Sequence, residues 1–430
     1  MLIPLKEKLF NSINLIINND KELSNFVIEL TEFDKYLIEN FGFNPNYSFN
    51  NNNNSSGNDQ WSGLIGDLIL FNTKIFNKWL SNEKLFVSHR YDEIVNTNQN
   101  ESEISINKDD DKNKSKSKNN KNNKLILQPF SIDFDIVKDG ETKPTNSSIN
   151  LKNLIENITK TFENLSLKFQ LKIISEVQLK LLDFYFEKLV NGLDALNLYK
   201  IEEINLNDDG VTVKYLERIL RIFNSSEYMI ENMQKWNEEI VFIELWNSIN
   251  DNNDNCFFTS VINNYNIKIN EKIFKIINNY FEKLINNNFK FYYNMNQWTN
   301  ENINEINNNE INFIIKLIKN ELIFLKKSIN FKNYLNIKIR ISKIILKFFN
   351  EKILKNFKIN IINSNKLEKD LNYIIESIEL PKLIEYKQFE QCIIVLTDKE
   401  KEKDVNQLKI KYKLDLIDDK LIKEMVLRRG

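Results

Sequence analysis

The sequence predicts an all-α protein, and two features of the chain support this prediction. No proline occurs between Pro144 and Pro381, and only Gly192 and Gly210 fall in that span as glycines. Strands need frequent turns, and turns draw on Gly and Pro for their backbone dihedrals. Apolar residues also recur three and four positions apart, which is the period of an amphipathic helix. Because each helix is apolar on one side only, we expect the helices to pack on one another.

The N-terminal region, residues 1–95, is expected to hold helices on either side of a loop at residues 42–60. The first apolar series consists of Leu23, Phe26, Val27, Leu30 and Phe33. The second consists of Leu64, Leu68, Phe71, Ile75 and Trp79. In residues 96–150 the apolar content falls and mixed charge with Ser, Lys and Asn takes over. We expect a low-complexity, disordered linker or insert there.

Two further helical bundles are expected, a middle one at 151–299 and a C-terminal one at 300–430, divided by an asparagine-rich stretch. The middle region begins with the series Leu151, Leu154, Ile155, Ile158, Phe162 and Leu165. It continues with Met229, Met233, Trp236, Ile240 and Ile243, and then with Ile273, Ile277, Tyr280, Phe281 and Leu284. The C-terminal region repeats the pattern at Ile311, Ile314, Ile315, Ile318, Leu322, Leu325 and Ile329. Pro381 is expected to end one helix, and the chain restarts toward Phe389.

The composition favours protein partners over other ligands. The chain carries 59 basic and 60 acidic residues, so no net field directs it to nucleic acid or to an anionic membrane. The lysine-rich run at 112–124 lacks interleaved aromatic residues and is read as a solvated linker. No stretch approaches the ~18 to 20 apolar residues that span a bilayer. Cys256 and Cys392 are the only cysteines and suit a reducing compartment.

Residues suited to catalysis are few, so we predict no enzyme activity, no cofactor and no metal. His89 is the only histidine, which excludes a metal site with two imidazoles. The nearest approach to a phosphate-binding loop is Gly63 and Gly66, with no Lys-Ser/Thr after them. The tryptophans in or beside apolar series are expected in the core, namely Trp79, Trp236, Trp246 and Trp298.

Several local strings follow one another in a recognisable order. The first places Phe33 and Asp34 ahead of Phe-Gly-Phe-Asn-Pro at 41–45, and the next reads Trp-Leu-Ser-Asn-Glu-Lys-Leu-Phe at 79–86. Further strings lie at 158–165, at 228–245 and at 391–396. In this order they resemble the RINT/TIP family of vesicle-tethering subunits of the Dsl and NRZ complexes. The match covers the C-terminal part of the family pattern, and the family's N-terminal arm has no counterpart before Met1.

The resemblance implies an elongated rod of successive helical bundles, the CATCHR architecture. It implies a non-enzymatic subunit of an ER-associated tethering complex that acts in Golgi-to-ER retrograde transport. Its partners would be other tethering subunits and ER SNARE proteins, and it would be a cytoplasmic protein, peripheral on the ER membrane through those partners. The residues that match family motifs, with structural roles expected, are Phe33, Asp34, Trp79, Leu80, Glu83, Phe86, Trp236, Phe242 and Cys392.

The resemblance has one departure, and the function has one alternative. The family's small-residue stretch appears here as Asn363-Ser364-Asn365, although Asp370 matches the family's acidic position. The alternative to tethering is a general helical interaction scaffold unrelated to it. A scaffold of the repeat type would show a fixed period of about 30 to 45 residues, and the sequence shows none. No partner-binding residue is identified at this level.

Overall fold

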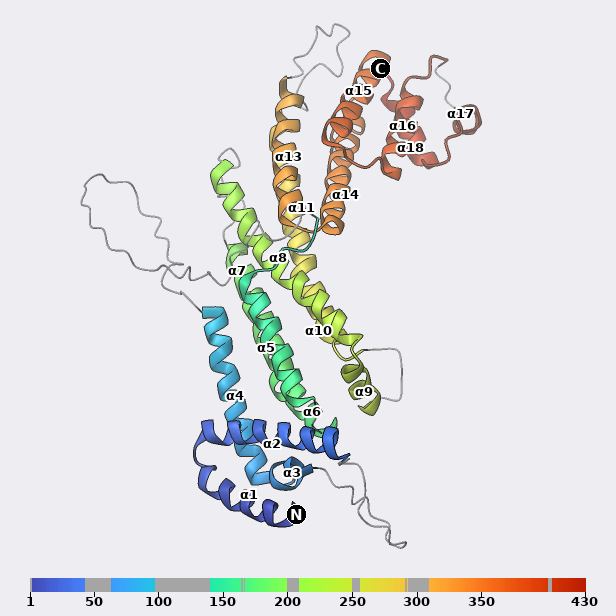
Figure 1. Ribbon diagram of the computed structural model, residues 1–430. Coiled ribbons are helices and arrows are strands. Elements are labelled where there is room, and N and C mark those ends of the chain that lie inside the picture. The colour runs from blue at the N-terminus through green and yellow to red at the C-terminus, as the bar shows by residue number, and fades with distance from the viewer. Residues whose placement is uncertain are drawn as a thin grey trace, which may run out of the picture. The chain divides into compact units, whose positions relative to one another are not determined.

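The computed structural model describes residues 2–42, 63–96, 140–163, 165, 167–198, 209–249, 256–290, 292, 309–400 and 404–430. These residues are almost entirely helical, which confirms the all-α prediction (Figure 1). Within these ranges β structure occurs only as isolated bridges, which include Gly140 with Asn330 and Ile359 with Arg429.

The chain divides into two compact units, each assembled from separate stretches of sequence. The first comprises residues 1–132, 144–192 and 225–266, and the second residues 133–143, 193–224 and 267–430. The four regions expected from the sequence, at 1–95, 96–150, 151–299 and 300–430, therefore stay a prediction. Most of the expected linker lies outside the described residues, and its last part already enters a helix at Asn146.

The first unit contains α1 (Leu2–Ile16), α2 (Asp20–Phe41), α3 (Gly63–Ile65), α4 (Thr73–Asn96), α5 (Asn146–Phe162), α6 (Leu167–Ile173), α9 (Ile240–Ile249) and α10 (Thr259–Tyr265). Helices α7 (Leu179–Leu198) and α8 (Asp209–Asn237) contribute residues to both units. The second unit contains α11 (Glu271–Asn288), α13 (Asn309–Ser328), α14 (Phe331–Phe348), α15 (Ile361–Ile378), α16 (Ile384–Leu396), α17 (Val405–Tyr412) and α18 (Asp419–Arg428). Single π-helical turns occur at 66–70, 174–178, 266–270 and 349–354.

Asparagine and aspartate side chains begin many of these helices, as the scarcity of glycine and proline requires. The side chain of Asn330 accepts the Asn333 N–H at 2.9 Å, and that of Asn360 accepts the Asn363 N–H at 2.8 Å. Such N-caps satisfy backbone donors that have no partner within the helix. The C-cap of α15 is Glu379, which takes the left-handed conformation with φ at 56°. Glycine usually takes this left-handed position, and here a glutamate takes it instead.

The predicted apolar series form the cores of both units. On α5, Leu151, Ile155, Ile158 and Phe162 are buried. All seven residues of the C-terminal series are buried, six of them on α13 and Ile329 directly after it. The helix break at Pro381 is also present, because α15 ends at Ile378 and α16 begins at Ile384.

Two of the predicted series run across helix breaks, and each has exposed residues at or beyond the break. Helix α8 ends at Asn237 and a turn reorients the chain, so Ile240 is 72% exposed and α9 buries Phe242 and Leu245 instead. The series from Leu64 to Trp79 is likewise not one helix. A break precedes α4, where the Asn72 side chain accepts the Ile75 N–H at 3.3 Å, and Phe71 is exposed.

Candidate protein-interaction site: the groove between helices α2 and α4

Asp34 joins α2 to the turn that precedes α4. Its two carboxylate oxygens accept the backbone N–H groups of Leu64 at 3.0 Å and of Ile65 at 2.9 Å. Gly63 approaches closely, because a Cβ at this position would lie 2.5 Å from Asp34 Oδ2. Burial raises the pKa of Asp34 above its ordinary value, although the two N–H bonds act in the opposite direction. This family-motif residue thus caps α3 from another helix.

Trp79 and Leu80 anchor α4 in the core of the first unit. Trp79 is 1% exposed, and its ring lies 5.7 Å from Phe76 and 5.4 Å from Phe162 of α5. Leu80 is buried on the same helix. These contacts fix the rotation of α4 about its own axis, and so they determine where the side chains of its next turn point.

Glu83 lies one turn after Trp79, at the point where α4 emerges from the core. The neutral side chains of Ser24 and Trp79 lie beside its carboxylate and act to lower its pKa. Burial nevertheless raises the pKa of Glu83, because two neutral donors do not fully replace water around the charge. Phe86, three residues further on, is 60% exposed.

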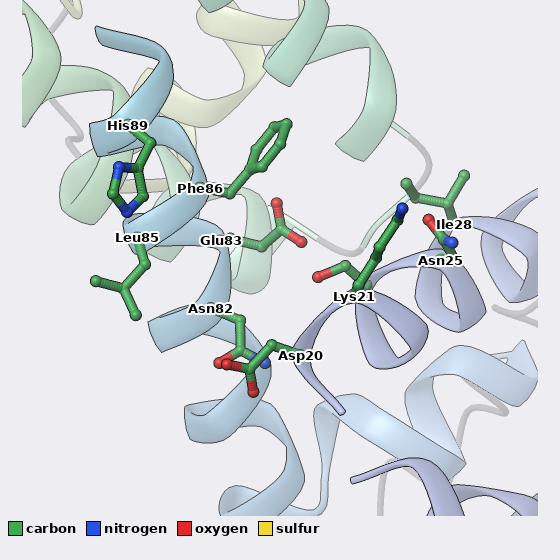
Figure 2. Close-up of a pocket in the computed structure, with 10 residues that line it drawn as sticks. Asp20, Lys21, Asn25, Ile28, Asn82, Glu83, Leu85, Phe86 and His89 are labelled. Atoms are coloured by element: carbon green, nitrogen blue, oxygen red, sulfur yellow. The ribbon is translucent and has the colours of Figure 1, made fainter. Parts of the chain in front are cut away.

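A groove of about 520 Å³ separates the first turns of α2 from the middle of α4. It is lined by Asp20, Lys21, Ser24, Asn25 and Ile28 of α2 and by Asn82, Glu83, Leu85, Phe86 and His89 of α4. Glu83 and Phe86 point toward α2, whereas Leu85 and His89 lie along the other flank of α4 (Figure 2). The groove is therefore apolar at Ile28 and Phe86 and acidic at Glu83.

Asn82 gives the groove an unsatisfied donor. Its side chain is buried, with the residue 5% exposed, and its Nδ2 has no hydrogen-bond partner among the described residues. Buried side-chain amides normally have such partners. This amide nitrogen is itself covered, so the donor lies beneath the surface of the groove.

The remaining family-motif residues lie away from the groove. Phe33 lies on α2 and is 37% exposed, whereas Leu23, Val27 and Leu30 of the same predicted series are buried. Trp236 and Phe242 are buried and pack on Phe258, with ring centroids 5.6 and 5.0 Å from it. Cys392 is buried on α16 in the second unit, and burial raises its pKa to about 12. A thiol in this state is a poor nucleophile.

Two further predictions concern tryptophans and acids outside the motif residues. Trp246 is half-buried, and Trp298 lies outside the described residues. Asp370, the acidic position matched to the family, is buried on α15 and accepts the Tyr292 hydroxyl at 2.8 Å. Its role in this structure is a buried hydrogen bond within the second unit.

The groove was not predicted from the sequence. Ile28, Leu85 and Phe86 are apolar residues outside the buried faces of α2 and α4. Such extra apolar residues were the feature of the sequence that could have indicated an interaction surface. Within the described ranges, no cluster of His, Cys, Asp and Glu could hold a metal ion. None of the described helices combines the length and apolar character needed to cross a bilayer.

Comparison with known proteins identifies the family. In a crystal structure of the SNARE Sec20 bound to the Dsl1 complex subunit Tip20, one chain matches with a TM-score of 0.66. The match covers 99% of this chain and 68% of the other, at 14% sequence identity, so it establishes a shared fold. No curated protein sequence matches significantly. The model of the RINT-1/TIP-1 family matches residues 1–428. The chain therefore belongs to the RINT-1/TIP-1 family.

Proposed function

We propose that this chain is a non-enzymatic subunit of an ER-associated vesicle-tethering complex that acts in Golgi-to-ER retrograde transport. Its partners are ER SNARE proteins and other subunits of the complex. The observation that carries the proposal is the family match over residues 1–428. The likeness to a structure containing Tip20 and a bound SNARE supports it, because that structure shows the same helical fold in such an assembly.

The physical character of the described units agrees with this proposal. Packed amphipathic helices present long lateral surfaces, which suit the binding of other helical proteins. The groove between α2 and α4 is one such surface, with exposed Phe86 beside a carboxylate. Attachment to the ER membrane through protein partners requires no membrane-spanning helix of the chain itself.

A flotation assay tests the proposal directly. The purified chain is mixed with liposomes that carry the cytosolic regions of ER SNAREs, with bare liposomes, and with liposomes that carry SNAREs of another compartment. We expect the chain to float with the ER SNARE liposomes and to stay at the bottom of the gradient with the other two. Equal flotation with bare liposomes would show direct lipid binding, and absence of flotation from all three would contradict SNARE binding.

A further inference from the structure

The groove contains an acidic charge that lacks an oppositely charged partner. Glu83 forms no ion pair among the described residues, and the polar side chains beside its carboxylate, Ser24 and Trp79, are neutral. The other carboxylate of the lining, Asp20, already pairs with Lys78 at 2.8 Å. Lys21 and His89 are exposed on the rim, and neither pairs with Glu83. The half-buried charge of Glu83 is therefore open to a cation from outside.

The apolar part of the groove lies next to this charge. Ile28 is 40% exposed on α2, and Phe86 is 60% exposed on α4 (Figure 2). Phe86 follows Glu83 by three residues, so both project from the same side of α4. An occupant that covers Phe86 therefore passes within reach of the Glu83 carboxylate.

The dimensions of the groove correspond to about two turns of an α-helix. The lining runs from Asp20 to Ile28 on α2 and from Asn82 to His89 on α4. At 1.5 Å per residue these stretches are each about 10 to 12 Å long. Helix-in-groove recognition uses apolar anchors at positions i, i+3 and i+4, which fit in this length.

We propose that the α2–α4 groove binds an amphipathic helix of a protein partner, whose apolar residues cover Ile28 and Phe86 and whose lysine or arginine pairs with Glu83. Charge complementarity selects this occupant. An anionic lipid headgroup would bring a negative charge to Glu83, and a purely apolar helix would bury that charge without compensation. The inference rests on the proposed function only in taking the occupant to be a protein.

Photo-crosslinking in cells of the source organism tests the proposal with the full chain. The probe is p-benzoylphenylalanine placed at position 86, and the control is the same residue placed at position 184. Phe184 is 50% exposed on α7 and lies outside the groove lining. We expect the probe at position 86, and not at 184, to cross-link to a helical segment that has a lysine or arginine within one turn of the attachment point.

Charge variants then test the ion pair. Glu83→Gln keeps a carbonyl acceptor for Ser24 and Trp79 but removes the charge, and we expect the cross-link yield to fall about tenfold. Glu29→Gln, on an exposed position of α2, is the matched control and should leave the yield unchanged. Glu83→Arg combined with an acidic residue at the partner's basic position should restore the cross-link. Thermal melting of each variant separates loss of binding from loss of folding. If Glu83→Gln lowers the melting temperature, Phe86→Ser with the benzophenone probe moved to position 85 tests the groove instead.

Several outcomes would overturn the inference. These are cross-links at position 86 no stronger than at 184, cross-links only to lipid or to this chain itself, and attachment to a segment without a basic residue. A yield unaffected by Glu83→Gln would also overturn it. The flotation assay uses the parent chain and tests SNARE binding separately. SNARE binding without a cross-link at position 86 would contradict only the groove proposal. A cross-link to a basic helix without flotation on SNARE liposomes would support the groove proposal and contradict SNARE binding.

Discussion

At the scale of single residues, Asp34 and Gly63 constrain each other. Gly63 has φ at +83°, and any Cβ there would meet Asp34 Oδ2 at 2.5 Å. Gly63→Ala should therefore destabilise the chain both through backbone strain and through displacement of the carboxylate from the N–H groups of Leu64 and Ile65. Asp34→Ala should cost about 2 kcal/mol, since it leaves two buried donors without their acceptor.

The two substitutions should not be additive. When Asp34→Ala has removed the carboxylate, Gly63→Ala retains only the backbone strain, so its cost should be smaller than in the parent. Urea unfolding of the four proteins of this double-mutant cycle measures the coupling. Additive costs would show that the Cβ meets no obstacle at Asp34.

Trp79 and Trp236 should be structural residues. Both are buried against aromatic neighbours, and replacing either by Ala should cost about 3 to 5 kcal/mol. Phe86→Ala is the control, since this exposed ring should contribute little to the free energy of unfolding. Variants of either tryptophan that unfold like the parent but lose a partner would instead place these rings in an interface.

Asp370 should make stability depend on pH in the acid range. Burial raises its folded-state pKa above the ordinary value of 3.8. The folded chain then holds this proton more tightly than the unfolded chain does. The stabilising contribution is complete below pH 3.8 and is lost as the pH rises through the raised folded-state value.

The variant Asp370→Asn isolates this effect, because its amide oxygen can still accept the Tyr292 hydroxyl. We expect the free energy of unfolding of the parent, relative to the variant, to decrease as the pH rises from about 3.8. Unfolding curves at several pH values provide the measurement. A difference that is flat across this range, or that grows with pH, would contradict the assigned direction.

At the scale of helices, periodicity identified cores but not breaks. The α13 series from Ile311 to Ile329 is buried throughout, because one uninterrupted helix keeps a constant face toward its neighbours. The series that includes Trp236 fails at Ile240, because a turn after Asn237 reorients the chain. That turn is held by a distant contact, in which the Asn237 side chain accepts the Phe258 N–H at 2.9 Å. A spacing rule applied to nearby residues contains no information about such a contact.

The candidate site was predictable only in part for the same reason. The apolar series indicated that Trp79 would be buried, and the motif drew attention to Glu83 and Phe86. The groove exists because the first turns of α2 lie across from these residues, with Ser24 meeting Glu83. Residues from two helices that lie about 30 positions apart in the sequence define it, so no single stretch of sequence carries its signature.

The break between α8 and α9 leads to a further prediction. Ile240→Ser should change the free energy of unfolding by no more than about 0.5 kcal/mol, because the side chain is 72% exposed. Met233→Ala, on the buried face of α8, should cost about 2 to 5 kcal/mol. Chemical denaturation of both variants tests the contrast, and similar losses would show that Ile240 is covered in solution.

At the scale of the whole molecule, the segment 97–122 should be dispensable for stability. Its sequence is dominated by charged and polar residues and lacks the apolar area needed to offset conformational entropy. Deleting it should leave the melting temperature within about 3 °C of the parent, because loop length changes closure entropy only slowly. Calorimetry of the deletion, beside a version with a glycine-serine segment of equal length, tests this. A large fall in melting temperature in the deletion alone would show that the length of the segment matters. A fall in both variants would show that the native segment packs on the rest of the protein.

The interleaving of the two units has a consequence for synthesis on the ribosome. Residues 193–224 belong to the second unit, but they are translated before the first unit is finished at residue 266 and well before residues 267–430 exist. Leu193, Leu216, Ile219 and Leu220 are buried in the finished chain, and during this interval they lack the part of the second unit that residues 267–430 form. At typical translation rates of about 5 to 20 residues per second, the interval lasts about 10 to 40 s. The nascent chain therefore requires chaperone protection during these seconds, and a ribosome that stalls late leaves a product with an apolar surface open to aggregation.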